Sequence, residues 1–270
     1  IPMRGAEPPG VVASSESMND FAVAGPMART ASDLSLALDV MAGPDEWLDR
    51  KGSQLVLPAA PYQRLRDYRV LVIDQHPLCP VNSEVKRAID TLSSNLIRAG
   101  VTVSRGDHDV PDLSEIAHTY AQLFTSFAAE KMSIEEYRKK EIMVKDRQGD
   151  DSFLASQLRG FVLSHREWMI VMRLRKQLRR QWRQLYNKYD VVLLPISPTP
   201  AFPHDHSDII NRQIKIEGVS VPYVNQHVWG SVAVLFGLPS TAIPISHTEQ
   251  GLPIGVQVIG NDLEDHTTIG

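Results

Sequence analysis

Two hydrophobic patterns alternate along the chain, and together they predict helices packed against buried strands. Continuous apolar runs at residues 69–74 and 190–195 are typical of strands buried on both faces, as in a parallel sheet. At residues 82–99 the apolar positions recur every three or four residues, which predicts an amphipathic helix ended by Gly100. A short strand at residues 101–103 follows, so strand, helix and strand are predicted to form a βαβ unit.

Further helices are predicted on both sides of this unit. Thr30 is a candidate cap for a helix that Gly43 ends. Residues 112–141 have a helical pattern, and residues 152–187 are predicted to form one long helix. A short apolar helix is predicted over residues 225–236, before Gly237.

The last part of the chain predicts two closing strands, at residues 241–245 and 256–259, with a Gly/Pro turn at 251–255. Residues 203–222 are expected to form a loop or a small hairpin, and residues 44–67 a connecting loop. The fold class that these elements predict is α/β, with a mixed β-sheet flanked by helices.

Composition narrows the classes of protein. The 270 residues suit one large domain or two ordinary ones, and 43% hydrophobic with 22% charged residues is typical of a globular protein. The formal net charge of −4 gives no reason to expect nucleic acid as a partner. A single cysteine, Cys79, excludes an internal disulfide and favours a reducing, cytoplasmic compartment. No apolar run approaches the roughly 20 residues of a membrane helix, so no membrane partner is expected.

Both ends of the sequence look abrupt. Residues 1–5 have no initiator Met and no signal-peptide pattern, and are typical of the middle of a loop. At the other end, Thr267 or Thr268 could cap a helix that would follow. We therefore expect residues 1–270 to be a portion of a longer protein, truncated at both ends.

Candidate chemical groups are few. The run His204-Asp205-His206 offers three possible metal ligands, but adjacent positions do not share a helical face and no HExxH spacing occurs, so no metal site and no cofactor is predicted. Cys79 lies between a predicted strand and a predicted helix, which leaves open a reactive thiol or a packed, inert one.

Serine nucleophiles and phosphate loops are equally unsupported. The sequence contains no Gly-x-Ser-x-Gly, GxGxxG or GK[ST] motif. The pairs Ser14-Ser15 and Ser93-Ser94 lack flanking glycines, and the second pair is expected to bond back to its own helix. Basic residues gather between Arg173 and Arg183, which indicates either an anion or RNA contact or a solvated helix face. No complete active site emerges from the residues themselves.

Four stretches, in this order and spanning nearly the whole chain, resemble the amidase signature family. They are Ile1-Pro2-Met3-Arg4-Gly5 with Glu7-Pro8-Pro9-Gly10; Ala24-Gly25-Pro26-Met27-Ala28-Arg29-Thr30 with Ala42-Gly43-Pro44-Asp45; Tyr189-Asp190-Val191-Val192-Leu193-Leu194-Pro195 with Pro198-Thr199-Pro200; and Gly237-Leu238-Pro239-Ser240 with Gly251-Leu252-Pro253-Ile254-Gly255-Val256-Gln257-Val258-Ile259-Gly260. The first two are most similar to bacterial amidases that act on small amides.

The resemblance implies a hydrolase that cleaves a small carboxamide to a carboxylate and ammonia or an amine. The family uses a Ser nucleophile, a bridging Ser preceded by a cis peptide bond, and a Lys base. These residues lie upstream of the segment that matches Pro2-Met3-Arg4-Gly5, and no Ser or Lys here matches them. No catalytic residue is therefore assigned, and this fragment alone is expected to be inactive. The expected partners are the amide substrate and the upstream half of the same polypeptide; without that half, exposed apolar surface favours a homo-oligomer.

The predicted substrate cleft is lined by the loop after the strand that ends at Pro195 and by the helix near Asn225. Ser197, Thr199, Asn225 and Trp229 are the candidate substrate-binding residues, because ligands of open α/β sheets bind at the carboxyl ends of strands. For Trp229 a plain core role is the alternative. Two other functions remain open: a component of an amidotransferase that acts on a tRNA-linked substrate, which the same family includes, and a non-catalytic interaction module with the same fold.

Overall fold

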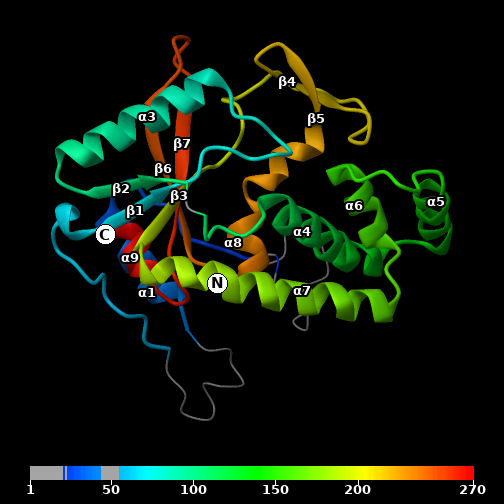
Figure 1. Ribbon diagram of the computed structural model, residues 1–270, viewed down its shortest axis with the longest axis horizontal. Coiled ribbons are helices and arrows are strands. Elements are labelled where there is room, and N and C mark those ends of the chain that lie inside the picture. Colours follow the sequence, from blue (N-terminus) through cyan, green and yellow to red (C-terminus); the bar gives the residue numbers. More distant parts are fainter. Residues whose placement is uncertain (1–20, 22, 44–54, 107) are drawn as a thin grey trace.

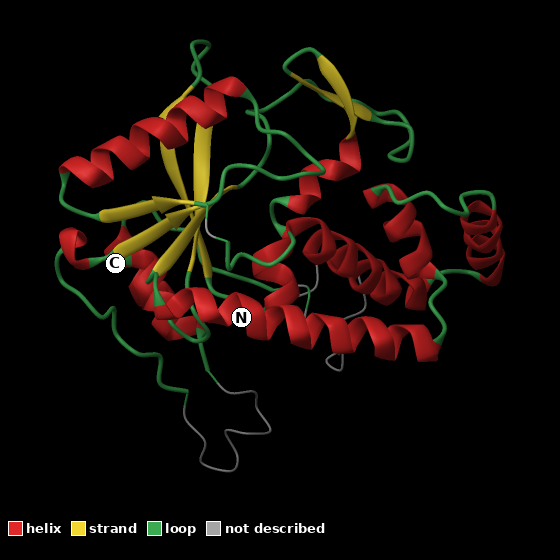
Figure 2. Cartoon of the chain, in the orientation of Figure 1, coloured by secondary structure: helices red, strands yellow, loops and turns green. Residues whose placement is uncertain are grey.

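The computed structural model describes residue 21 and residues 23–43, 55–106 and 108–270. Its main feature is a five-stranded sheet in the order β2-β1-β3-β7-β6, with a separate two-stranded sheet, β4-β5 (Figure 1). The main sheet is mixed, since β1 pairs in parallel with β2 and β3, whereas β7 pairs antiparallel with β3 and β6. Helices cover the sheet (Figure 2), so the predicted fold class, α/β with a mixed sheet, is confirmed.

The predicted βαβ unit is confirmed. Strand β1 (Arg69–Val72) leads into α3 (Ser83–Arg98) and then β2 (Thr102–Arg105), and β1 also pairs with β3 (Val191–Pro195). The Asn82 side chain caps α3 by accepting a hydrogen bond from the Glu84 amide at 2.8 Å. The loop before β1 contains a short 3₁₀ turn, η1 (Leu65–Asp67).

The closing strands are longer than the pattern predicts. β6 (Ser240–His247) and β7 (Pro253–Ile259) form an antiparallel pair with an irregularity between Pro244 and Ser246. The expected small hairpin is also present, as β4 (Gln213–Ile216) and β5 (Val219–Pro222). Its turn residues, Glu217 and Gly218, have φ of 51° and 79°, the pattern of a two-residue I′ turn.

The first helix agrees with its prediction, and the central helical region is more divided than expected. α1 (Ala31–Met41) begins after Thr30, whose hydroxyl accepts from the Asp33 amide. The single helix predicted over residues 152–187 is wrong. It is replaced by α6 (Phe153–Phe161), α7 (His165–Arg183) and a 3₁₀ turn, η3 (Gln184–Asn187).

A capping box explains the break between α6 and α7. The Ser164 hydroxyl accepts from the Glu167 amide, and the Glu167 carboxylate accepts from the Ser164 amide. A second capping box, at Ser133 and Glu136, divides the region 112–141 in the same way. That region consists of α4 (Leu113–Ala128), the 3₁₀ turn η2 (Ala129–Lys131) and α5 (Ile134–Lys145).

Two expectations near the carboxyl end require correction. The helix predicted over residues 225–236 consists of a 3₁₀ segment, η4 (Tyr223–Val228), and the shorter α8 (Ser231–Phe236). Gly237 ends α8 in the left-handed conformation, with φ of 64°. Thr267 and Thr268 do not cap a following helix, because both lie inside α9 (Asp265–Ile269).

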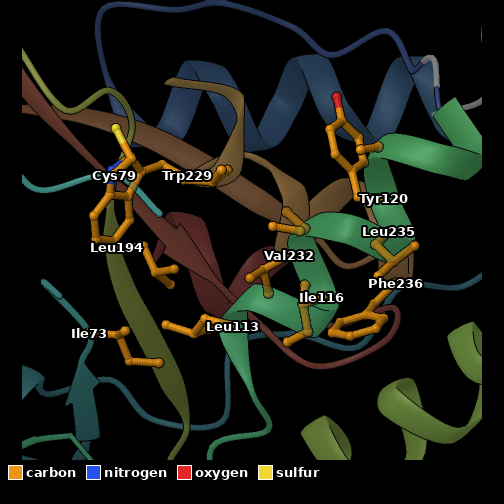
Figure 3. Packing of buried hydrophobic residues seen from close by; sticks show 14 of the residues in the cluster. Ile73, Cys79, Leu113, Ile116, Tyr120, Leu194, Trp229, Val232, Leu235 and Phe236 are labelled. Carbon is orange, nitrogen blue, oxygen red and sulfur yellow. The ribbon is translucent and has the colours of Figure 1, made fainter. Parts of the chain in front are cut away.

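The apolar core has one part on each face of the main sheet. Alternate residues of β1 and β3 face opposite sides: Leu71 and Leu194 join the larger cluster with α4, α7 and α8, whereas Val72 and Leu193 join a smaller one against α3. Figure 3 shows part of the larger cluster. Among the described helices, none combines the length and apolar character required to span a membrane.

Candidate functional site at the carboxyl edge of the sheet

The loops that follow β1 and β3 meet at one edge of the sheet, because these two strands are parallel. Two hydrogen bonds join the loops to each other and to η4. The Asn82 amide donates to the Pro198 carbonyl at 2.8 Å, and the Asn225 side-chain amide donates to the Leu78 carbonyl at 2.9 Å. The Cys79 amide closes a turn onto the His76 carbonyl. This edge is where a ligand is expected in an open α/β sheet.

Gln257 fastens this edge to the turn between η4 and α8. Its side-chain amide is buried and donates to the carbonyls of Pro195 and Trp229, both at 2.7 Å. The hydrophobic pattern did not single out this residue. The only signal is a polar side chain within the apolar run Val256-Gln257-Val258-Ile259, where a buried amide requires hydrogen-bond partners.

The four predicted substrate-binding residues lie at this edge in different environments. Ser197 is half-buried, and its hydroxyl accepts from the Thr199 amide at 3.5 Å. The Thr199 hydroxyl is buried and has no hydrogen-bond partner in the described part of the chain. Asn225 holds the Leu78 loop, as described above. Trp229 is 0% exposed and belongs to the larger core cluster.

Of these four residues, Thr199 lines an open cleft with a volume of about 510 Å³. The cleft lies between the 199–205 loop, the β4-β5 hairpin and the turn that joins β6 to β7. In it, the Arg212 guanidinium lies 4.9 Å from the centre of the Tyr223 ring, and the Phe202 ring meets Tyr223 edge-on at 6.0 Å. The volume falls in the range of small-molecule sites, and the lining mixes aromatic with charged groups.

Cys79 is packed and inert at this edge. Its side chain is fully buried, next to Trp229 (Figure 3), and burial raises the pKa of the thiol to about 12. The thiolate, which is the nucleophilic form, is therefore scarce at neutral pH. His76 lies edge-on to the same tryptophan at 5.4 Å, and its Nδ1 accepts from the Leu78 amide. Burial lowers the pKa of His76 to about 4, so this imidazole is neutral.

The structure describes the Ser93-Ser94 pair and the His204-Asp205-His206 run. The hydroxyls of Ser93 and Ser94 donate to carbonyls four residues back in α3, as expected. Ser14 and Ser15 lie outside the described residues. The ring centroids of His204 and His206 are 6.2 Å apart. Within the described ranges, no group of three or more His, Cys, Asp or Glu side chains is placed to hold a metal ion.

Three arginines of α7 bind to other parts of the chain. Arg175 is buried, donates to the Leu235 carbonyl at 2.6 Å and lies over the Phe21 ring. Arg179 and Arg183 both pair with the carboxylate of Asp262. The remaining basic side chains of the run, Arg173, Lys176 and Arg180, contribute to the solvated part of the helix. The basic run therefore has a structural side as well as a solvated side.

Two polar clusters were not predictable from the sequence because their members are far apart in the chain. His266 of α9 lies between two α1 residues: its Nδ1 is 3.0 Å from the Ser35 hydroxyl, and its Nε2 is 3.0 Å from the Asp39 carboxylate. In the second cluster, the Ser156 hydroxyl lies 2.9 Å from both His118 and Arg159. Ser156 is 1% exposed, so this hydroxyl joins α4 to α6 rather than facing solvent.

Comparison with solved structures places this architecture in one fold class. A bacterial aryl acylamidase of the amidase signature enzymes superposes with a TM-score of 0.63 at 19% identity, covering 91% of this chain and 50% of that chain. A Glutamyl-tRNA(Gln) amidotransferase component from Thermotoga maritima gives a TM-score of 0.62 at 20% identity, with the same two coverages. The fold is therefore that of the amidase signature enzymes.

The sequence identifies the family. The Amidase family model matches residues 7–269, nearly the whole chain, and the chain therefore belongs to that family. An indoleacetamide hydrolase from Bradyrhizobium diazoefficiens is 28% identical over 247 residues, covering 87% of this chain and 42% of the relative. A Glutamyl-tRNA(Gln) amidotransferase component from Oceanobacillus iheyensis is 24% identical, covering 96% of this chain and 54% of the relative. The chain thus spans about half the length of these curated relatives.

Proposed function

We propose that this chain is the carboxyl-terminal portion of an amide hydrolase and provides scaffold and cleft for cleavage of a small carboxamide to a carboxylate and ammonia or an amine. Membership of the Amidase family supports the reaction class. The coverage of about half of each relative supports the proposal that residues 1–270 are only part of the functional unit.

The bond-breaking groups of this proposal lie on polypeptide outside residues 1–270. A Ser/Lys mechanism requires a lysine amine within hydrogen-bonding reach of a hydroxyl. Three described lysines have other partners: Lys139 pairs with Glu135, Lys188 with Asp109, and Lys140 lies over a phenylalanine ring. The support for a nucleophile and base on the upstream half is that no Ser or Lys of this sequence matches the family's catalytic residues.

The direct test is an amidase assay on the purified chain, with simple aryl and aliphatic amides as substrates. The proposal predicts no turnover by residues 1–270 alone and turnover when the upstream half of the same polypeptide is present. Ammonia release measured with a coupled assay is the readout. Amide hydrolysis that copurifies with the isolated chain would overturn the assignment of the catalytic groups.

Ser197, Thr199, Asn225 and Trp229 remain the proposed substrate-binding residues. The support is strongest for Thr199, which lines the cleft with an unpartnered hydroxyl. In the full-length enzyme, Thr199→Val removes that hydroxyl while keeping the side-chain shape, and Trp229→Phe keeps most of the buried ring. Both are expected to raise KM for at least one amide substrate. An unchanged substrate profile in both variants would remove these residues from the site.

A second candidate function is that of an amidotransferase component that acts on a tRNA-linked substrate. The curated relatives named as parts of a Glutamyl-tRNA(Gln) amidotransferase favour it. The net charge of −4 counts against it, and Arg179 and Arg183 are paired with Asp262. The exposed Arg173, Lys176 and Arg180 keep it open. Titration with tRNA at increasing salt separates the two functions, because binding through phosphates weakens steeply with salt. We expect no specific tRNA binding.

A further inference from the structure

The Glu217 carboxylate ties the tip of the β4-β5 hairpin to the first residue of α3. The hairpin forms its own two-stranded sheet, apart from the main sheet (Figure 1). Ile214 and Ile216 of β4 are buried in the larger core cluster, but such apolar contacts have no preferred direction. Within the described part of the chain, the hydrogen bond that joins residues 213–222 to another element runs from the Ser83 amide to the Glu217 carboxylate, at 2.7 Å.

Glu217 has a backbone conformation that its residue type disfavours. Its φ of 51° lies in the left-handed region, and the first central position of a I′ turn favours Asn, Asp or Gly. A glutamate in this conformation is strained, and such strain persists where a surrounding contact compensates for it. Here the amide and the hydroxyl of Ser83 donate to the carboxylate and lower the pKa of Glu217, and the charge of Arg87 acts in the same direction. The contact of the side chain with α3, rather than the turn, therefore accounts for a glutamate at this position.

The two ends of this contact belong to two walls of the open cleft. Ser83 lies between Asn82 and Glu84, which line the cleft at the start of α3. Glu217 directly follows β4, whose residues 213–215 line the cleft on the hairpin side. The hydrogen bond therefore determines how far the hairpin lies from the start of α3.

We propose that Glu217 is a positioning residue for amide hydrolysis: its carboxylate holds the hairpin against α3 and so fixes the width of the substrate cleft. This rests on the proposed function, which assigns the cleft to the amide substrate, and it adds the contact that shapes that cleft. Glu217 acts through residues 213–215, which line the cleft. Loss of the contact weakens substrate binding and raises KM, whereas kcat stays nearly unchanged because the bond-breaking groups are not moved.

The test compares two substitutions at Glu217 in the full-length enzyme. Glu217→Gln keeps the length of the side chain and one acceptor oxygen, so the bond from the Ser83 amide is retained. Glu217→Asn is one methylene shorter and loses that bond, but Asn suits the I′ turn, so the fold is expected to be kept. Glu136→Asn is the matched control, because Glu136 accepts from the Ser133 amide at 2.9 Å within the capping box of α5 and does not line the cleft.

Hydrogen exchange at residues 213–222 and the kinetics of hydrolysis of one aryl and one aliphatic amide are the two readouts. Urea denaturation verifies that each variant folds. We expect Glu217→Asn to speed exchange across the hairpin and to raise KM about threefold or more for at least one amide, with kcat nearly unchanged. Glu217→Gln and Glu136→Asn are expected to match the wild type in exchange at the hairpin and in KM.

Each other outcome counts against a specific claim. Unchanged exchange in Glu217→Asn would overturn the proposal, whether or not the enzyme is active, because the hairpin would then not need the contact. Faster exchange with an unchanged KM would also overturn it, while the observed amide turnover would still support the proposed function. An equal rise in KM for the Gln and Asn variants would show that the charge matters and the contact does not. If the wild-type enzyme hydrolyses no amide, the proposed function fails, and the exchange rates alone decide whether Glu217 holds the hairpin.

Discussion

The residues at the carboxyl edge of the sheet are mostly fixed by hydrogen bonds to main-chain carbonyls. Gln257 alone joins two of them, at Pro195 and Trp229, and Asn225 holds a third, at Leu78. A sequence pattern can mark each of these polar side chains as unusual, but it does not identify the hydrogen-bond partner. Gln257 lies 62 residues from Pro195, and Asn225 lies 147 residues from Leu78. The position of Thr199 at this edge was predictable, since a loop after a buried strand needs no long-range partner.

His76 is expected to make stability depend on pH. Its pKa is lowered from 6.5 to about 4 by burial, so the folded state holds the neutral imidazole. Such a group contributes stability above pH 6.5 that is lost as the pH falls toward 4. Between about pH 7 and about pH 5, the unfolding free energy of the wild type should fall by roughly 2 kcal/mol more than that of His76→Asn. Urea titrations at the two pH values measure this difference, and parallel losses in both proteins would contradict it.

Gly160 is expected to tolerate no side chain. A Cβ at this position would overlap the Thr125 hydroxyl and the Gln122 carbonyl, and would lie 2.8 Å from the Gln122 Cα, because α4 and α6 pack closely here. We predict that Gly160→Ala lowers the unfolding free energy by about 1–3 kcal/mol. Gly43→Ala is the control, since a Cβ there meets no atom within 4 Å. Equal stability of the two variants would show that the helices can separate without cost.

At the scale of elements, the sequence predicts whether a segment is a helix or a strand better than it predicts where that segment begins and ends. The strands at residues 69–72 and 191–195 and the helix at residues 83–98 form where their patterns indicate, because period and burial coincide. The helix predicted over residues 152–187 fails because its apolar pattern continues through a break that two polar residues, Ser164 and Glu167, create. The motif is present in the sequence, but the hydrophobic period alone does not register it.

The Ser164 cap is expected to stabilise the start of α7. Ser164→Ala removes the acceptor for the Glu167 amide, and we predict a loss of about 1 kcal/mol in unfolding free energy. Ser94→Ala is the matched control, since Ser94 is exposed within α3 and bonds to its own helix. Chemical denaturation gives the stabilities, and hydrogen exchange at residues 165–168 locates the effect. No difference between the variants would mean that packing, not the cap, sets the α6–α7 boundary.

At the scale of the whole molecule, the described residues form a five-stranded sheet with an apolar core on both faces. The family and the mixed sheet follow from sequence stretches that span nearly the whole chain. The contact between α1 and α9 does not, because it is made by His266, which lies 231 residues from Ser35. Long-range pairing of this kind is set by tertiary structure, so the contact between α1 and α9 is recognisable only in the fold.

The most direct measurement of the central claim is amide hydrolysis by residues 1–270 with and without the upstream half of the polypeptide. Ammonia release from one aryl and one aliphatic amide is followed at matched concentrations of the chain. We predict no release above background from the chain alone and clear turnover from the two halves together. Sustained turnover by the chain alone would contradict it, because the nucleophile and base would then lie within these residues.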